Sequence, residues 1–404
     1  MGDYWAYLRN MGPAWVVSAV ACGPATLASV SIAGAKFGYS LLWVVVLSAI
    51  LATVSQYLAA KTGILGQEGV IHLVDVHLGR FWGWVLTIDA LFATWLASVI
   101  LMKALSGTMS IITGLSPPLW GIVFAIFFFL LLSLGGYSRF EIFCKLLVAV
   151  VVVCFVLTVV IVRPDIGPIL KGLVPMIPTG IDSAVTMAGI MGGAVHITII
   201  AMHTYTVNAR KWTIAETGLA RFDTVFSMLF AFGLYSVSIF LVAAVVLRPV
   251  GVQVRSPVDV AMSLAPLVGR YGQPIFLVGF WAALVSTISP TYLAGAYFLS
   301  DKLARKADPE NGWFRLFIAL GCGLSVFGPF LPGSFFLLLV DMLAIGLCGT
   351  PLILILIMIL LNRKSFSGNR RNSSLMNILG SAAIVVTTFL AARFILVKLG
   401  VWTP

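Results

Sequence analysis

Two apolar segments of the sequence, residues 13–34 and 181–207, contain polar and helix-breaking residues near their centres. The first contains Gly23-Pro24-Ala25-Thr26, and the second contains two adjacent glycines followed by His196. Proline removes a backbone hydrogen bond and glycine lets a helix unwind, so we expect breaks near Gly23–Ala25 and Gly192–Ile197. Backbone groups freed at such breaks, beside hydroxyl and imidazole side chains, are typical of a solute-binding site within a membrane. The alternative is a packing kink or close helix contact, which these residues also serve.

The residue types at these two breaks favour an anion over a bare divalent cation. The second half of the first segment, beginning near Thr26, would present helix N–H groups and the positive end of the helix dipole. His196 can donate a hydrogen bond when neutral and becomes a cation near physiological pH. A bare divalent cation needs at least one negatively charged ligand, which these residues do not supply. The residues predicted to bind the substrate are Gly23, Pro24, Ala25, Thr26, Ser29, His196 and Thr198.

Two further ionisable residues lie inside apolar segments, where an isolated charge is unfavourable. Lys103, in the segment 81–110, is predicted either to reach an aqueous path or partner, or to extend toward the helix end. Asp341, in the segment 334–361, could bind a cation, exchange protons or pair with an internal base. We treat both as auxiliary residues of a proton pathway.

The composition identifies the solvent of these segments as lipid. Of the 404 residues, 60% are hydrophobic and only 10% are charged, whereas a soluble globular domain has about 25% charged residues. The chain is therefore predicted to be an integral protein of the plasma or inner membrane and not a nucleic-acid binder, despite a net charge of +11. The five cysteines are scattered, without the paired spacing of a disulfide framework or zinc site.

Eleven segments are long and apolar enough to span a bilayer, which needs about 20 residues for a helix. They are 13–34, 39–60, 81–110, 117–135, 140–162, 181–207, 222–247, 273–299, 313–331, 334–361 and 375–398. The two interrupted segments are the first and the sixth, five spans apart. This spacing predicts a single transport domain over 1–404, with two inverted five-helix repeats at 13–162 and 181–361 and an extra helix at 375–398.

The distribution of basic residues predicts the orientation. With the N-terminus in the cytoplasm, the inside loops contain 15 Lys and Arg residues and the outside loops contain 7. Positively charged residues concentrate in cytoplasmic loops. We therefore expect a cytoplasmic N-terminus and an external C-terminus, and the excess positive charge also favours contact with anionic lipid headgroups.

Several short stretches resemble a known family. They are Gly12-Pro13-Ala14, Ala33-Gly34-Ala35-Lys36-Phe37-Gly38-Tyr39, Phe222-Asp223-Thr224, Ser286-Thr287 and Thr291-Tyr292-Leu293-Ala294-Gly295. The family they resemble is NRAMP, whose members are transition-metal transporters, and the likeness extends over nearly the whole chain. It implies an all-α integral membrane protein of the LeuT-like fold, with eleven transmembrane helices of which the first and sixth are broken.

The same resemblance implies that the metal-binding motif is lost. The family's first-helix motif Asp-Pro-Gly-Asn corresponds here to Gly23-Pro24-Ala25-Thr26. Aligning the later histidine of the sixth helix with His203 places His196 on the family's methionine and Thr198 on its first histidine. Two acids of the third helix correspond to Trp95 and Ser98. His203 is then a proton relay or an interhelical packing histidine, and Trp95 either walls the site or packs against neighbours.

These observations leave three functions open, in a fixed order of preference. The first is a secondary transporter of a small organic anion, a di- or tricarboxylate such as citrate, free or as a metal complex and coupled to protons. The second is a divalent metal (Mg²⁺ or Mn²⁺) transporter with an altered site. The third is a carrier of a neutral solute or amino acid, because a fold does not fix a substrate. No catalytic residues, enzyme activity, bound cofactor, resident metal or obligatory protein partner is predicted.

Overall fold

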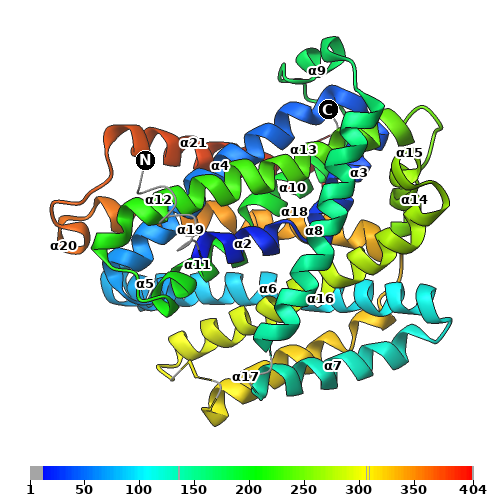
Figure 1. The fold of residues 1–404 in the computed structure, drawn as a ribbon. Helices are drawn as coiled ribbons and strands as arrows, with labels where there is room; N and C mark the ends of the chain where they lie inside the picture. Colours follow the sequence, from blue (N-terminus) through cyan, green and yellow to red (C-terminus); the bar gives the residue numbers. More distant parts are fainter. Residues whose placement is uncertain (1–11, 135–136, 306, 309, 403–404) are drawn as a thin grey trace.

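The structure is a computed structural model that describes residues 12–134, 137–305, 307–308 and 310–402, with the backbone alone for 137–148. It consists mainly of helices (Figure 1). In the first half these are α2 (Pro13–Ala21), α3 (Pro24–Phe37), α4 (Leu42–Gly66), α5 (Val70–Leu78), α6 (Arg80–Thr113), α7 (Pro117–Ser133), α8 (Tyr137–Val162), α9 (Ile166–Gly172), α10 (Ile181–Val195) and α11 (Ile197–Ala209). The second half contains α12 (Thr217–Thr224), η3 (Val225–Phe232), α13 (Gly233–Val242), η4 (Ala243–Leu247), α14 (Pro257–Ala261), α15 (Ala265–Val268), α16 (Gly272–Lys302), α17 (Gly312–Ser325), α18 (Phe335–Cys348), α19 (Thr350–Asn362), α20 (Lys364–Ser367) and α21 (Ser374–Lys398).

Each predicted spanning segment is mainly helical over its described residues. Among the described residues, 8 helical stretches are long and apolar enough to cross a membrane, and two shorter apolar helices cover Pro117–Ser133 and Ala149–Val162. One of the eight, Pro24–Gly66, includes both α3 and α4. It therefore accounts for two predicted segments.

The break in the first segment lies slightly earlier than predicted. Helix α2 ends at Ala21 and α3 begins at Pro24, so only Cys22 and Gly23 are outside a helix. The prediction of an unwound Ala25 was wrong, because proline at the first helical position already has the backbone angle that a helix requires. The carbonyl of Gly23 accepts the first backbone hydrogen bond of α3, from the Leu27 N–H at 3.1 Å, and a second one from the Tyr235 hydroxyl at 3.3 Å.

The break in the sixth segment is shorter than predicted. Helix α10 continues through Gly192 to Val195, and α11 begins at Ile197, so His196 alone is extended, with φ −61° and ψ 136°. The glycines serve close packing, not unwinding. A Cβ atom at Gly192 would lie 2.0 Å from the carbonyl oxygen of Leu343 in α18, so small residues let α10 and α18 approach.

A third discontinuity and two π-helical stretches were not predicted. Helices α18 and α19 are separated by Gly349, directly before Thr350-Pro351. Residues Val225–Phe232 and Ala243–Leu247 are π-helical within an otherwise continuous helix from 217 to 247. The break at Gly349 lies close to the sixth-segment break, because the Thr350 hydroxyl donates a hydrogen bond to the Val195 carbonyl at 2.5 Å.

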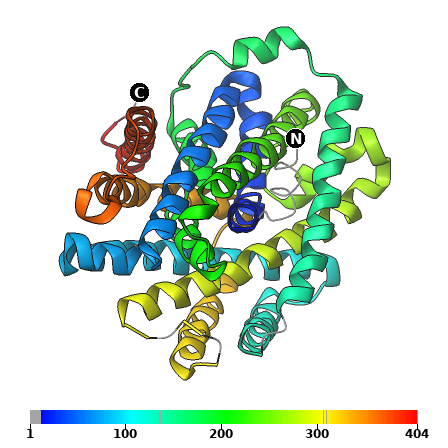
Figure 2. The same cartoon turned by 60° about the vertical axis from the view of Figure 1, so that its left-hand side comes forward.

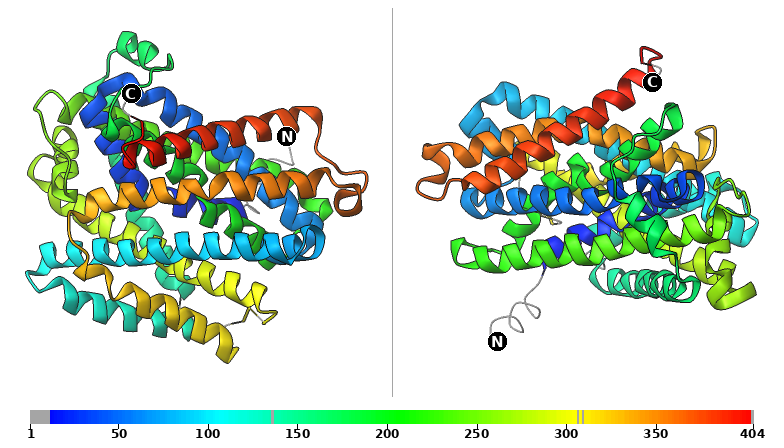
Figure 3. Two further views of the ribbon diagram at one scale, coloured as in Figure 1. Left: turned by 180° about the vertical axis from the view of Figure 1, so that it is seen from behind. Right: turned by 90° about the horizontal axis from the view of Figure 1, so that it is seen from above.

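The two broken helix pairs occupy the interior of the bundle. Helix α10 packs against α3, α4 and α18, while α2 packs against α11, α12, η3 and α16. Figure 2 shows α2, in dark blue, surrounded by other helices. Helix α21, in red, lies on the outside against α10, α18 and α19, and runs from the α20 end of the bundle toward the opposite end (Figure 3). Both breaks therefore lie among packed helices in the interior of the bundle.

Candidate functional site

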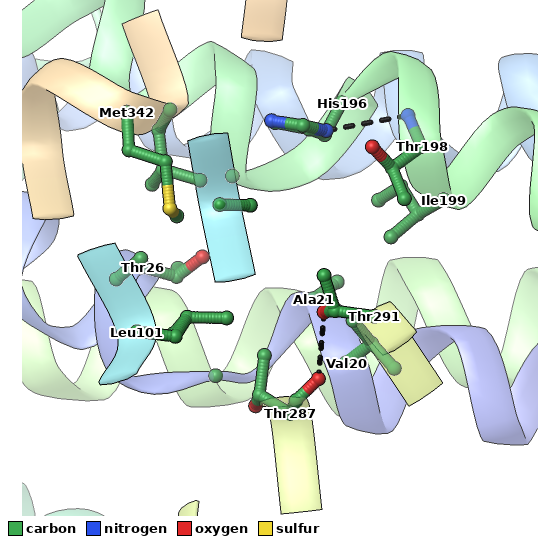
Figure 4. A pocket seen from close by; sticks show the side chains of 15 residues that line it. Val20, Ala21, Thr26, Leu101, His196, Thr198, Ile199, Thr287, Thr291 and Met342 are labelled. Atoms are coloured by element: carbon green, nitrogen blue, oxygen red, sulfur yellow. Dashed lines mark hydrogen bonds between the residues drawn. The ribbon is translucent and has the colours of Figure 1, made fainter. Parts of the chain in front are cut away.

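The two predicted breaks meet at a small cavity of about 50 Å³ (Figure 4). Helices α2, α3, α6, α10, α11, α16 and α18 contribute to its wall. Five of the seven residues predicted to bind substrate line it, whereas Pro24 and Ser29 do not. The lining residues are Val20, Ala21, Gly23, Ala25, Thr26, Ala97, Leu101, Gly193, His196, Thr198, Ile199, Thr287, Thr291, Met342 and Leu343.

His196 joins α10 to α11 and caps the second of these helices. Its Nδ1 atom accepts a hydrogen bond from the Thr198 backbone N–H at 3.2 Å, drawn as a dashed line in Figure 4. A neutral imidazole whose Nδ1 accepts holds its proton on Nε2. The Nε2 atom is buried and has no hydrogen-bond partner among the described residues. This Nε2 atom lies against Gly346 of α18, where a Cβ atom would be only 1.7 Å away, and Gly346 is not part of the cavity wall.

Four threonine side chains give the cavity its hydroxyl groups. Thr26 comes from α3, Thr198 from α11, and Thr287 and Thr291 from one face of α16. Thr198 Oγ1 lies 2.9 Å from Thr94 Oγ1, and Thr291 Oγ1 donates to the Thr287 carbonyl at 2.8 Å. The Thr287 hydroxyl is buried and unpaired within the described structure. A buried hydroxyl without a hydrogen bond is unfavourable unless a ligand or water supplies the missing partner.

Small residues bring these hydroxyls together. A Cβ atom at Gly193 would lie 2.4 Å from Thr26 Oγ1, and one at Gly23 would lie 2.8 Å from Thr287 Oγ1. Both distances are shorter than any real carbon–oxygen contact of this kind. A larger residue at either position would displace the threonine hydroxyl from its place at the cavity.

The cavity is lined without any charged residue. No Asp, Glu, Lys or Arg belongs to its wall. Nor does the described part of the chain contain a group of three or more His, Cys, Asp or Glu side chains that could hold a metal ion. The available donors are hydroxyl oxygens, backbone groups, the His196 imidazole and the Met342 thioether. This set matches a neutral or partly hydrated ligand better than a bare divalent ion.

The structure places the remaining predicted residues away from the cavity. Ser29 is buried with an unpaired hydroxyl. His203 is buried farther along α11, where its Nδ1 lies 2.9 Å from Gln56 Oε1 of α4. Asp341 forms an ion pair with Lys398 at 3.1 Å. Lys103 donates to the Leu331 carbonyl, which fixes α6 to the loop before α18.

Of the two alternatives predicted for Trp95, the structure agrees with packing against neighbouring residues. The Trp95 ring lies against Gly295 of α16, where a Cβ atom would be 3.2 Å from Nε1. Ser98 donates to the Trp95 carbonyl at 2.8 Å. Neither residue lines the cavity, and Ala97 and Leu101 of the same helix do so instead. These two lie on the face of α6 that turns toward the breaks.

Sequence reasoning missed Thr287, Thr291 and Met342. The two threonines are separated by one helical turn and so share a face, which was a usable signal in an apolar segment. Met342 had no such signal, because a methionine in an apolar helix is ordinarily a core residue.

Comparison with known proteins agrees with this architecture. Residues 14–397 match the family described as natural resistance-associated macrophage protein-like (Nramp). The chain is 28% identical over 298 residues to a protein of Deinococcus radiodurans named divalent metal cation transporter MntH, covering 71% of this chain and 68% of that protein. A protein of Chromohalobacter salexigens with the same name is 27% identical over 301 residues, covering 70% and 69%.

Solved structures show the same fold. A mutant of the Eremococcus coleocola manganese transporter superposes with a TM-score of 0.79 at 15% identity, covering 99% of this chain and 92% of that one. MhsT in complex with L-phenylalanine superposes with a TM-score of 0.61 at 14% identity, covering 97% and 99%. The fold is thus that of the LeuT-like transporters, and the protein is an integral membrane transporter and not an enzyme. With the family match spanning almost all of its length, the chain belongs to the Nramp family.

Proposed function

We propose that the chain is a secondary transporter of a divalent metal cation, which it binds with part of its water shell retained. The observation that supports this most directly is the size of the central cavity, about 50 Å³. A buried water occupies roughly 10–15 Å³ on this measure, whereas benzene needs a cavity of about 150 Å³. The space therefore suits an ion with a few waters and is too small for a tricarboxylate, which is larger than benzene.

The donor set around the cavity fits this substrate. Thr26 and Thr287 offer hydroxyl oxygens, and Met342 offers a thioether sulfur. Mg²⁺ commonly keeps several waters when proteins bind it, and thioethers suit softer transition metals. Because no carboxylate lines the cavity, we expect weaker binding than at a site with a negatively charged ligand. The names of the sequence relatives, divalent metal cation transporters, are consistent with this substrate class.

We further propose that protons influence transport and that the N-terminus is cytoplasmic. His196 lies at the cavity, and His203 lies farther along the same helix toward α4. The excess of basic residues in alternate loops supports the orientation. The two repeats, 13–162 and 181–361, would move against each other to expose the cavity to either side.

An organic anion is the second candidate, and one observation favours it. Ala25 and Thr26, in the first turn of α3 directly after Pro24, line the cavity and carry backbone N–H donors. Donors of this kind bind carboxylates. A carboxylate substrate would need a conformation with a larger central cavity than the one observed.

Uptake into liposomes distinguishes the two candidates. The purified chain is reconstituted, and uptake of Mn²⁺, Mg²⁺ and labelled citrate is compared with and without an inward proton gradient. We expect saturable metal uptake, with a KM about tenfold higher for Thr26→Val because one ligand is lost. Thr62→Val is the matched control, since that hydroxyl bonds only to the Leu58 carbonyl. Citrate uptake without any metal uptake would overturn the proposal.

A further inference from the structure

A second and larger cavity lies beyond the central one, at the end of the bundle where α21 ends. Its volume is about 530 Å³, within the range of roughly 300–1,000 Å³ that ligand pockets have. Helices α3, α10, α18 and α21 contribute to its wall, together with residues 251–255. Five charged side chains line it: Lys36, Asp182, Arg255, Asp341 and Lys398.

The charges in this cavity leave a surplus of positive charge. Lys36 of α3 pairs with Asp182 of α10, and Lys398 of α21 pairs with Asp341 of α18. The Arg255 guanidinium has no carboxylate partner in the described structure, and it donates to the Gln253 side chain. Three cations thus face two carboxylates, so a cation would be repelled from this space while an anion would be attracted.

A buried arginine adds to the positive charge beside the cavity. Arg393 of α21 is only 1% exposed. It donates to the Pro178 carbonyl at 2.7 Å, to Ser183 Oγ at 3.2 Å and to the Met187 sulfur at 3.1 Å. All three acceptors are neutral, and no carboxylate pairs with this guanidinium among the described residues. Buried charges are ordinarily paired, and Ser183, which accepts from this guanidinium, directly follows the cavity residue Asp182.

The walls of the two cavities share three closely packed helices. A Cβ atom at Gly189 would lie 2.6 Å from Val340 Cγ1 and 3.2 Å from Ser29 Oγ. These three residues belong to α10, α18 and α3, the helices that line both cavities. An occupant of the larger cavity would therefore contact helices that also form the wall of the central cavity.

We propose that the larger cavity binds a small di- or tricarboxylate anion. Its carboxylate groups would pair with Arg255, Lys398 and Lys36, replacing part of the weak exposed pairs that these lysines now make. Such exposed ion pairs contribute little, so an anion can displace them. Ile32, Val185 and Val340 provide an apolar wall for the carbon skeleton. The proposal is independent of which solute the central cavity transports.

Calorimetry on the purified full chain, in detergent without anionic lipid, tests this site with citrate as the probe. Lys398→Gln and Arg255→Gln should each weaken citrate binding about tenfold, since each removes a charge-assisted hydrogen bond. Asp341→Asn should strengthen binding, because it removes the carboxylate that competes for Lys398. Arg270→Gln, an equal loss of charge at a separate cavity of the same loop region, should leave binding unchanged.

The direction of each change in citrate affinity tests the proposed anion site. Citrate binding that responds equally to Arg270→Gln reflects only net charge and overturns the proposal. Weaker citrate binding by Asp341→Asn would contradict the proposal. Tighter Mn²⁺ binding by Lys398→Gln, without any citrate binding, would identify a cation site and would also overturn the proposal. Binding of anionic lipid vesicles without citrate binding excludes a soluble carboxylate. Lys398→Arg keeps the charge and should retain citrate affinity. Retained affinity in this variant would show that the loss in Lys398→Gln comes from the missing charge and not from misfolding.

Discussion

The imidazole of His196 occupies the space that a side chain at position 346 would need. A Cβ atom at Gly346 of α18 would lie 1.7 Å from Nε2 and 2.2 Å from Cδ2 of that ring. Helix α18 therefore holds the histidine against the break between α10 and α11. This contact fixes the ring in the orientation in which Nδ1 faces the Thr198 N–H.

Gly346→Ala should displace this ring and impair transport. The added methyl group cannot coexist with the imidazole, so the hydrogen bond to Thr198 is lost and about 1–3 kcal/mol of stability goes with the overpacking. Uptake assays and thermal unfolding measure the two effects. Gly323→Ala in α17 is the control, because its Cβ would meet nothing within 4 Å.

A double variant tests whether the loss of stability in Gly346→Ala comes from the collision with His196. Combining His196→Ala with Gly346→Ala removes the collision, so the second substitution should cost little in that background. An equal loss of stability in both backgrounds would show that the methyl group acts elsewhere on α18.

Asp223→Asn should loosen the start of α2. The buried carboxylate of Asp223 accepts hydrogen bonds from the backbone N–H groups of Gly12 at 3.3 Å and Ala14 at 2.9 Å. A carboxylate at a helix N-terminus is favoured by both the free N–H groups and the dipole. We expect the free energy of unfolding to fall by roughly 1–3 kcal/mol. We also expect faster maleimide labelling of Ser18→Cys, measured in a background without native cysteines.

Asp259→Asn provides a matched comparison for this helix start. Asp259 also accepts backbone N–H bonds, from Arg255 at 2.9 Å and Ser256 at 2.8 Å, but in a loop helix. It should leave the labelling of position 18 unchanged. Equal acceleration in both variants would mean that general destabilisation, and not release of α2, exposes the thiol.

Thr287→Val should separate stability from function. The Thr287 hydroxyl is buried and makes no hydrogen bond within the described structure, so removing it leaves no partner unpaired. We therefore expect an unfolding temperature equal to or above that of the parent protein, together with weaker metal uptake. Thr387→Val in α21 removes a hydroxyl that bonds to Ala383 at 2.7 Å and should not alter uptake. Normal uptake by Thr287→Val would remove this hydroxyl from the ligand set.

The sequence predicted the spans and the two inner breaks because both depend on local signals. Hydropathy over 20 residues marks a span, and a Gly-Pro pair marks a break, as at Gly23 and Pro24. The extent of the breaks was not predictable in the same way. A glycine such as Gly192 suggests a flexible backbone, but in the structure it makes room for the Leu343 carbonyl. This contact joins segments that are distant in the sequence, so local signals do not predict it.

The site was predictable only where a residue lies at a break. His196 and Thr26 lie at or beside one, and both line the cavity. Trp95 and Ser98 were placed by alignment with a family motif, but Ala97 and Leu101 of the same helix line the cavity instead. The ion pair between Asp341 and Lys398 joins α18 to α21. It could not be predicted from either segment alone, because it depends on how α21 packs against α18.

The pH dependence of uptake distinguishes a cationic from an anionic substrate. Protonating His196 puts a hydrogen on Nδ1, which now accepts from the Thr198 N–H, and adds a positive charge beside the cavity. A unit charge at about 4 Å in an effective dielectric near 20 is worth about 4 kcal/mol before desolvation. Metal uptake should therefore fall at the acidic pH at which His196 becomes protonated. An anion would show the opposite trend.

His196→Gln should flatten this profile, since glutamine keeps hydrogen bonding without a titrating charge. His72→Gln is the control, because His72 is exposed on α5 and far along the chain from the cavity lining. The measurement is the initial rate of Mn²⁺ uptake with equal pH on both sides, so that a proton gradient does not contribute. A profile unchanged by His196→Gln would assign the titrating group elsewhere, with His203, which faces Gln56 of α4, as the next residue to replace.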